Sequence, residues 1–376
     1  MRMSVLKKVL TLFTFLFLWV LPCDAVAASP SLQQAKKDAE SKGYVFFATH
    51  DDIVARAKKE GKLRVMTGLE RSNYQPLING FKQQYPFMTD VHIEELQGSD
   101  ARQRVLLEIK AGQAKGWDTP FIPIDFAKEY MPYLMKHDIL GMAKHGVLKI
   151  HPGMIHPIER NMVSVTSIIT VIPYNRKLIS EDIVPANLED FLKPAFKGKK
   201  FVLDLRPLGV APLVAAWGLE RTLDFARKLA AQEPVWGRGS TRVNAVIATG
   251  EYSFYLGSNF TAINRAMSKD RTGSLTYKIS EPVPTINVWH ASGVLNTADH
   301  PHAALLWFEF LASPVGQKII DQHEPLGASV FTPGSATEKV TRGKKVSVID
   351  WDHFTEFQGY TEKIVGAYGL PKADTK

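Results

Sequence analysis

The sequence predicts an α/β protein with two lobes, each built on a mixed, mainly parallel sheet flanked by helices. Strand-like apolar segments alternate with helical segments between residues 62 and 122, and again between 201 and 256. This alternation is typical of βαβ units in a parallel sheet. The chain has 376 residues, whereas a single hydrophobic core stops growing at ~250–300 residues. Two lobes are therefore expected.

The first 27 residues have the three parts of a signal peptide. Arg2, Lys7 and Lys8 precede an apolar run at 9–21, and small residues follow up to Ala27. The run is shorter than the ~20 residues that a membrane-spanning helix needs. We therefore expect cleavage near Ala27 and release of a soluble chain into the periplasm.

Cys23 is the only cysteine of the chain. Acylation of Cys23 would produce a lipoprotein, but Pro22 directly before it argues against this, because proline resists the extended fit that a peptidase needs. Cleavage near Ala27 leaves no cysteine, which excludes disulfides and a cysteine nucleophile.

The net charge of the chain is moderately positive. The full sequence has 46 Lys and Arg against 38 Asp and Glu, a formal net charge of +8. Removal of Arg2, Lys7, Lys8 and Asp24 with the signal peptide changes +8 to +6. Such a field favours anionic ligands or surfaces.

The first lobe is expected to contain three strands in βαβ order. The expected elements are a surface helix within 28–60, a strand at 63–67, a helix at 77–85 closed by Pro86, a strand at 91–96, a helix opened by Asp100 and closed by Gly112, and a strand at 117–122. Sheets of this type bind ligands beyond the carboxyl ends of their strands. The loops at 68–73, 97–100 and 123–125 are therefore the candidates for ligand contact.

The chain is expected to cross twice between the lobes. A long apolar, strand-like run at 162–173 leaves the first lobe, and the run at 285–291 returns to it. Between them we expect a strand at 201–205, a helical segment at 210–228, and a strand at 252–256 that the segment 245–250 precedes. After them we expect a helix near 301–311 and an amphipathic helix at 350–368. The predicted division is lobe 1 at 28–168 with 291–325, lobe 2 at 169–290, and a C-terminal helical segment at 326–376 that packs at the hinge or on lobe 2.

Three stretches carry a family resemblance. They are an opening βα segment from Gly61 to Pro86, a segment from Tyr174 to Lys199 that includes Leu188-Glu189-Asp190-Phe191-Leu192, and a late helix from His300 to Gln317. In this order and spacing they resemble the periplasmic binding proteins of the extracellular solute-binding class, which includes the ferric-iron binders of ABC importers. The resemblance implies a type II periplasmic-binding-protein fold that closes around one ligand at its hinge and delivers it to a membrane permease.

One departure from the family bears on the ligand. Ferric binders of the family carry a tyrosine pair soon after a Gly-Glu such as Gly250-Glu251, whereas this chain has Phe260-Thr261 at that distance. Neither side chain offers a phenolate to Fe(III). Tyr252 and Tyr255 are three positions apart, an odd offset, so on one strand they face opposite sides of the sheet.

Arginines at strand ends are the first candidate ligand contacts. Arg71 and Arg206 follow predicted strands, and Arg238 lies in the segment 237–242 with Ser240. A guanidinium binds carboxylate or phosphate through two parallel hydrogen bonds. The segment 237–242 suits an anion-binding helix start, although a capped turn explains it equally well. Each single arginine can also be a solvated surface charge.

Other polar residues complete the predicted site. They are Thr67, Glu70, Ser99, Tyr174, Ser258, Asn259 and His290. Turn formation, hinge packing and solvation are the structural alternatives for these residues. No HExxH spacing is present, so we expect no metal site, and no cofactor is expected either.

The preferred hypothesis is a periplasmic substrate-binding component of an ABC importer for a small anionic organic solute, phosphorylated or carboxylated. The same scaffold binding Fe(III) or a ferric chelate is the alternative, and a two-lobed hydrolase or transferase is a remote one. No nucleophile-elbow motif and no basic patch with interleaved aromatic residues occurs. We therefore expect neither an enzyme nor a nucleic-acid-binding protein.

Overall fold

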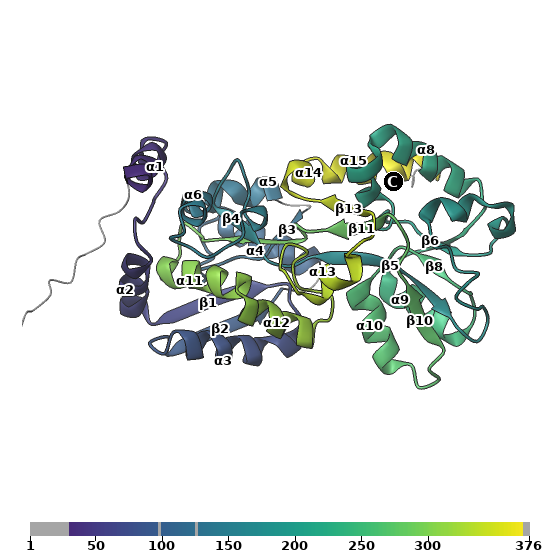
Figure 1. The fold of residues 1–376 in the computed structure, drawn as a ribbon, viewed down its shortest axis with the longest axis horizontal. Helices are drawn as coiled ribbons and strands as arrows, with labels where there is room; N and C mark the ends of the chain where they lie inside the picture. The colour runs from purple at the N-terminus through teal and green to yellow at the C-terminus, as the bar shows by residue number, and fades with distance from the viewer. Residues whose placement is uncertain (1–29, 97–98, 125–126, 371–376) are drawn as a thin grey trace, which may run out of the picture.

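The computed structural model describes residues 30–96, 99–124 and 127–370. The predicted signal peptide, its cleavage site and Cys23 lie outside the described residues. Figure 1 shows two lobes side by side along the long axis. Within the described ranges, no helix is both long and apolar enough to cross a membrane.

The first lobe contains a parallel strand pair covered by helices. Its elements up to residue 144 are α1 (Pro30–Ser41), α2 (His50–Glu60), β1 (Lys62–Thr67), α3 (Tyr74–Gln84), β2 (Asp90–Glu95), α4 (Ser99–Lys110), α5 (Ala127–Tyr130) and α6 (Ile139–Lys144). β1 pairs with β2 in parallel from Lys62↔Asp90 to Thr67↔Glu95. The alternating apolar residues of β1 place Leu63 and Val65 in the core.

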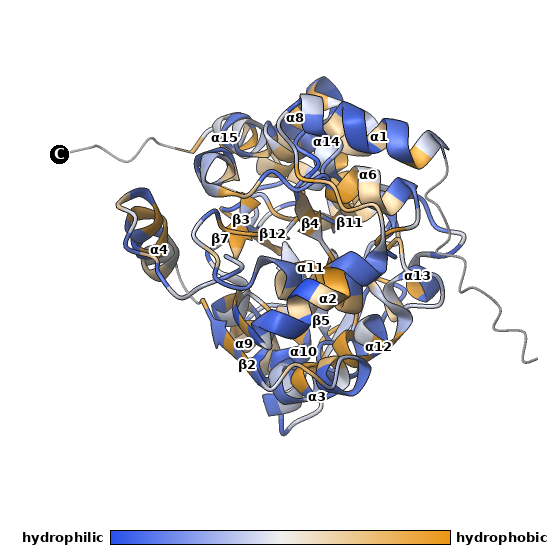
Figure 2. Cartoon of the chain, turned by 90° about the vertical axis from the view of Figure 1, so that its left-hand side faces the viewer, coloured by the Kyte–Doolittle hydropathy of each residue, from blue (hydrophilic) through white to orange (hydrophobic). Residues whose placement is uncertain are grey.

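A second sheet and two late helices complete this lobe. β3 (Ile122–Pro123) and β4 (Met162–Ser164) both pair antiparallel with β12 (His290–Gly293). α11 (Pro301–Ala312) is buried from Ala303 to Leu311 and packs against α2, and α12 (Pro314–His323) follows it. Hydrophilic colours predominate on the outer helices such as α1 and α3 in Figure 2.

The second lobe is built on two sheets. The mixed sheet has the order β10 (Leu275–Lys278), β5 (Ile168–Asn175), β11 (Val283–Ile286) and β13 (Val346–Ile349), with β9 (Ser258–Asn259) also on β5. The parallel sheet has the order β7 (Val235–Gly237), β6 (Val202–Asp204) and β8 (Tyr255–Leu256). Its helices are α7 (Val214–Trp217), α8 (Leu219–Ala230), α9 (Ser240–Thr249) and α10 (Phe260–Lys269).

The C-terminal segment packs on the second lobe and differs from the prediction. It contains α13 (Ala336–Thr341), α14 (Trp351–Phe354) and α15 (Phe357–Ala367), but also β13, which pairs in parallel with β11. The prediction of a purely helical segment was therefore wrong. The alternating burial of Val346–Ile349 is a strand pattern of only four residues, too short to stand out.

Several predicted elements are divided in the structure. The run at 162–173 forms β4 and β5, because the chain changes lobes between them. The helical run at 210–228 divides at Gly218, whose φ of 78° is left-handed. The strand at 117–122 is reduced to β3 and one bridge between Val65 and Thr119. The residues after Asp350 form two helices, α14 and α15. The single helix predicted within 28–60 is also two helices in the structure, α1 and α2.

Three chain crossings at the hinge are joined by one side chain. Asn287, fully buried in the second crossing, accepts hydrogen bonds from Ser167 Oγ at 2.8 Å and Ser329 Oγ at 3.3 Å through its side-chain oxygen, and from Ser164 Oγ at 2.7 Å through its carbonyl. Ser164 and Ser167 belong to the first crossing and Ser329 to the third. The crossings support lobe boundaries near 168 and 290, and the exact boundaries stay a prediction.

Candidate functional site

A cleft of about 550 Å³ lies between the lobes at the hinge. The first lobe contributes Gly68 and Glu70 from the loop after β1, and Glu324 from the end of α12. The second lobe contributes Arg206 and the first turns of α9 and α10, and the crossings contribute Ile168, Trp289 and His290. The loop after β1 and Arg206 after β6 therefore meet at one cavity, as expected for carboxyl ends of parallel strands.

Three arginines of the second lobe line the cleft. Arg206 follows β6, Arg242 lies in the first turn of α9, and Arg265 lies in α10. Arg242 has no ion-pair partner within the described ranges, and its side chain is exposed. These positions place guanidinium groups, each able to bind a carboxylate or phosphate, along one wall.

Buried groups beneath Arg206 orient this arginine. Asp204 is buried at the end of β6, accepts the backbone N–H of Arg206 at 2.9 Å, and lies 3.5 Å from its guanidinium. The Tyr255 hydroxyl donates to the same carboxylate. Burial, followed by the charge of Asp204, raises the pKa of Tyr255, so the hydroxyl stays a donor. The buried pair thus supports Arg206 from below.

Two helix N-termini point their first turns at the same wall. α9 begins at Ser240 after Gly239, whose φ of 90° only glycine adopts without strain. α10 begins at Phe260 after Asn259, whose side chain accepts the N–H of Ala262 at 2.8 Å. The positive end of a helix dipole and its free N–H groups favour a negative charge. Both helix N-termini therefore add to the positive potential that the arginines create along this wall.

The first-lobe wall is acidic. The Glu324 carboxylate is 6% exposed and accepts the Glu70 N–H at 3.1 Å and Asn73 Nδ2 at 3.2 Å. Burial raises the pKa of Glu324 to about 7, while Arg265 and hydrogen bonds from Thr261 and Asn73 partly oppose this. The Glu324 carboxyl is therefore partly protonated near neutral pH, and Glu70 is the second carboxyl group of this wall.

Contacts cross the cleft from one wall to the other. Glu70 forms an ion pair with Arg265, and the Thr261 hydroxyl hydrogen-bonds Glu324. Glu70 and Glu324 belong to the first lobe, whereas Arg265 and Thr261 belong to α10 of the second. The two lobes therefore touch across the cavity in this structure.

Five of the predicted ligand residues line the cleft: Glu70, Arg206, Ser240, Asn259 and His290. His290 Nδ1 lies 3.4 Å from Thr166 Oγ1, and its ring packs edge-on against Phe121 at 5.1 Å between centroids. Thr67 lines a neighbouring cavity of only about 40 Å³ that shares His290. Ser99 is the first residue of α4, and its side chain lies outside the description.

Four predicted ligand residues lie outside the cleft lining. Tyr174 is in the core at the far end of β5, six residues beyond Ile168, which corresponds to about 20 Å of strand. Ser258 is buried and accepts Asn244 Nδ2 at 3.0 Å. Arg71 and Arg238 are exposed outside the cleft lining. A strand end or turn position alone does not fix the direction of a long side chain.

Six polar or aromatic side chains of the cleft lining were not among the predicted ligand residues. They are Thr241, Arg242, Thr261, Arg265, Trp289 and Glu324. Arg242 belongs to the segment 237–242 that was considered, and a helix starting at Ser240 would have placed it in the first turn. Arg265 is one helical turn after Thr261, a spacing that predicts a shared face. Glu324 reaches the cleft through tertiary packing alone.

The donor set of the cleft differs from a tyrosine-based iron site. Thr261 lines the cleft where the resemblance would place a tyrosine, and no tyrosine is among the described lining residues. Its carboxylates are Glu70, paired with Arg265, and Glu324, bonded by Asn73 and Thr261. No group of three or more His, Cys, Asp or Glu within the described ranges is arranged to hold a metal ion.

Comparison with known proteins gives a consistent result. The sequence profile of a family described as bacterial extracellular solute-binding protein matches residues 77–347. A search of curated proteins gave no match.

Solved structures share the fold at low sequence identity. Mannheimia haemolytica ferric iron-binding protein A in an open conformation has a TM-score of 0.63 and 15% identity, covering 82% of this chain and 99% of its own. Iron-bound HitA from Pseudomonas aeruginosa has a TM-score of 0.59 and 16% identity, and the match covers 82% of this chain and 99% of HitA. A substrate-binding protein of an ABC transporter from Agrobacterium tumefaciens has a TM-score of 0.59 and 16% identity. This match covers 82% of this chain and 94% of the other. The fold is therefore that of two-lobed periplasmic binding proteins.

Proposed function

Because the chain belongs to the family of bacterial extracellular solute-binding proteins, we propose that it captures a small organic anion, phosphorylated or carboxylated, for import. Family membership gives the coarse function, a periplasmic solute-binding component of an ABC transporter. The choice of an anion rests on one observation: three arginines and two helix N-termini line the second-lobe wall of the cleft. Such groups bind carboxylate and phosphate through charge-assisted hydrogen bonds.

Capture follows from differential affinity for the two arrangements of the lobes. Arg206, Arg242 and the N–H groups of α9 hold the anionic group on the second lobe, and Glu70 and His290 face it from the opposite side. A ligand that contacts both walls binds the closed state better and shifts the population towards it. The permease then receives the closed, loaded protein.

A ferric chelate is the second candidate. The named iron-binding neighbours support it, since they share the fold. Carboxylates of a chelating anion would face the arginines of this cleft, while the lining offers no phenolate for direct coordination. A complex of this kind therefore depends on the chelator rather than on protein ligands.

Calorimetric titration and thermal unfolding of the full secreted protein test the proposal. Glycerol 3-phosphate and citrate serve as anionic probes, glycerol as the neutral control, and ferric citrate as the iron probe. A bound anion at about 100 times its Kd adds ~2.7 kcal/mol of stability. Response to glycerol alone contradicts an anion site, and response to ferric citrate without any to citrate favours the iron alternative.

A further inference from the structure

A second cavity of about 480 Å³ lies directly beside the cleft. Arg206 and Trp289 line both cavities. The two spaces therefore share a boundary at these side chains, and a molecule held by Arg206 in the cleft would lie next to the second space.

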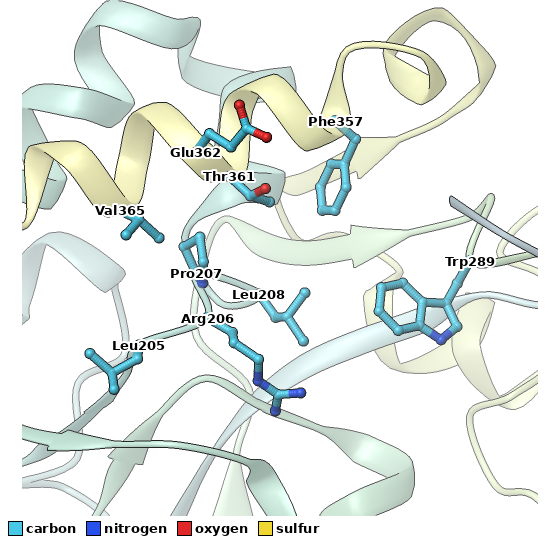
Figure 3. Close-up of a pocket in the computed structure, with 9 residues that line it drawn as sticks. All are labelled: Leu205, Arg206, Pro207, Leu208, Trp289, Phe357, Thr361, Glu362 and Val365. Carbon is cyan, nitrogen blue, oxygen red and sulfur yellow. The ribbon is translucent and has the colours of Figure 1, made fainter. Parts of the chain in front are cut away.

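The walls of this side pocket are mainly apolar. Figure 3 shows the loop 205–208 on one side, α15 on the other and Trp289 at one end. Leu208 from the loop and Phe357 and Val365 from α15 supply hydrocarbon surface, and Thr361 supplies a hydroxyl. The Arg206 side chain extends away from α15, and the Glu362 carboxylate points away from the loop. The charged groups are thus at the edges.

The α15 wall comes from a segment beyond the family profile. The profile ends at residue 347, and α15 covers Phe357–Ala367. α15 packs against α8 and buries Phe357 and Ile364, while Val365 keeps 37% of its surface exposed. The profile match covers the second-lobe wall of the cleft but not Gly68 and Glu70, and the side pocket includes α15, which lies after the last matched residue.

We propose that the solute is amphiphilic: its anionic group binds in the cleft at Arg206, and a hydrocarbon chain or ring occupies the side pocket between loop 205–208 and α15. This inference rests on the proposed function of the cleft. Ligand sites combine apolar walls with a few placed polar groups, and together the two cavities have this composition. The apolar part would contact Leu208, Phe357 and Trp289.

Titration with two series of equal chain length tests this. The probes are n-alkyl phosphates and the matching fatty acids from two to eight carbons, with n-alkanols as neutral controls. Burial of each CH₂ contributes ~0.8 kcal/mol, or roughly a fourfold rise in affinity per carbon until the pocket is filled. The expected result is such a rise for the anions and much weaker binding of the alkanols.

Variants of the side pocket test where the hydrocarbon chain of the ligand binds. Val365→Trp fills the side pocket and should reduce octyl phosphate affinity to that of ethyl phosphate, while ethyl phosphate binding stays unchanged. Thr361→Trp acts on the same wall from the next turn and provides a second, independent filling. Val315→Trp is the matched control, because Val315 is an exposed helical valine outside both cavities.

The outcomes separate the two proposals. Anion binding without dependence on chain length overturns the side-pocket inference and leaves the anion function standing. A length dependence that Val365→Trp and Thr361→Trp leave intact also overturns it. Alkanols binding as tightly as the phosphates contradict the anion function but support an apolar site, and no binding in any series contradicts both.

Discussion

The two walls of the cleft have opposite chemistry. The second-lobe wall carries Arg206, Arg242 and Arg265 with two helix N-termini, whereas the first-lobe wall carries Glu70 and Glu324. The walls attract each other through Glu70 and Arg265 before any ligand is present. An anion that reaches Arg265 would compete with the Glu70 carboxylate. The difference teaches that affinity depends on competition between the walls as well as on the arginines.

Removal of the cationic wall should have the largest effect. Arg206→Ala and Arg242→Ala each remove hydrogen bonds to a charged ligand that contribute about 1.5–3 kcal/mol, so each variant should lose roughly 10- to 100-fold in anion affinity. Titration calorimetry measures the loss. Arg238→Ala is the matched control, since Arg238 is an exposed neighbour outside the cleft. Equal losses in the control would show that the arginines act only through net charge.

The acidic wall should make the folding stability depend on pH. The folded pKa of Glu324 is raised to about 7 by burial, so its contribution to stability is fully present below its unfolded pKa near 4.5 and is lost as pH rises through 7. Arg265 and Glu95 face the same carboxylate with opposite influence. Glu324→Gln should remove this dependence, which amounts to something on the order of 3 kcal/mol.

Denaturant unfolding of both proteins at pH 4.5 and pH 8 measures this effect. The variant should gain stability relative to the parent at pH 8, while the difference between them should be least at pH 4.5. A parallel pH dependence in the two proteins would contradict a raised pKa at Glu324. Glu94→Gln is the control, because Glu94 is exposed on β2.

The contact between the walls should have the smallest effect. Glu70→Gln removes the ion pair and frees Arg265, and pairs of this exposure contribute at most about 1 kcal/mol. Anion affinity should therefore rise up to roughly fivefold, and the ligand-free protein should become more open in small-angle scattering. Unchanged scattering with weaker anion binding would mean that Glu70 contacts the ligand instead, for example through an amine or hydroxyl.

The sequence predicted the scaffold better than the orientation of side chains. Strand and helix periodicity located β1, β2 and β6, and the rule for strand ends placed Glu70 and Arg206 correctly at the cavity. The same rule did not bring Arg71 to the cavity: it begins a 3-10 turn after β1, is exposed and is not among the lining residues. Tyr174 lies far from the hinge because β5 extends well beyond the crossing, and Tyr174 is near its far end.

Residues brought in by packing could not be predicted. Glu324 lies 254 positions from Glu70 in the chain, yet it accepts the Glu70 N–H in the structure. Trp289 directly precedes His290, but its position between two cavities depends on α15. The sequence predicted a helix in this region but not what it packs against. Only the fold determines such neighbours, because no short-range pattern connects them.

The single side chain that joins the three crossings has a consequence for folding. Asn287 receives hydrogen bonds from both other crossings through its two oxygens. Displacement of either neighbouring crossing would leave buried hydroxyl and carbonyl groups without these bonds, which costs about 1–3 kcal/mol per group. The lobes are therefore thermodynamically coupled, and a half-folded molecule with one intact lobe is disfavoured during the protein's life outside the cytoplasm.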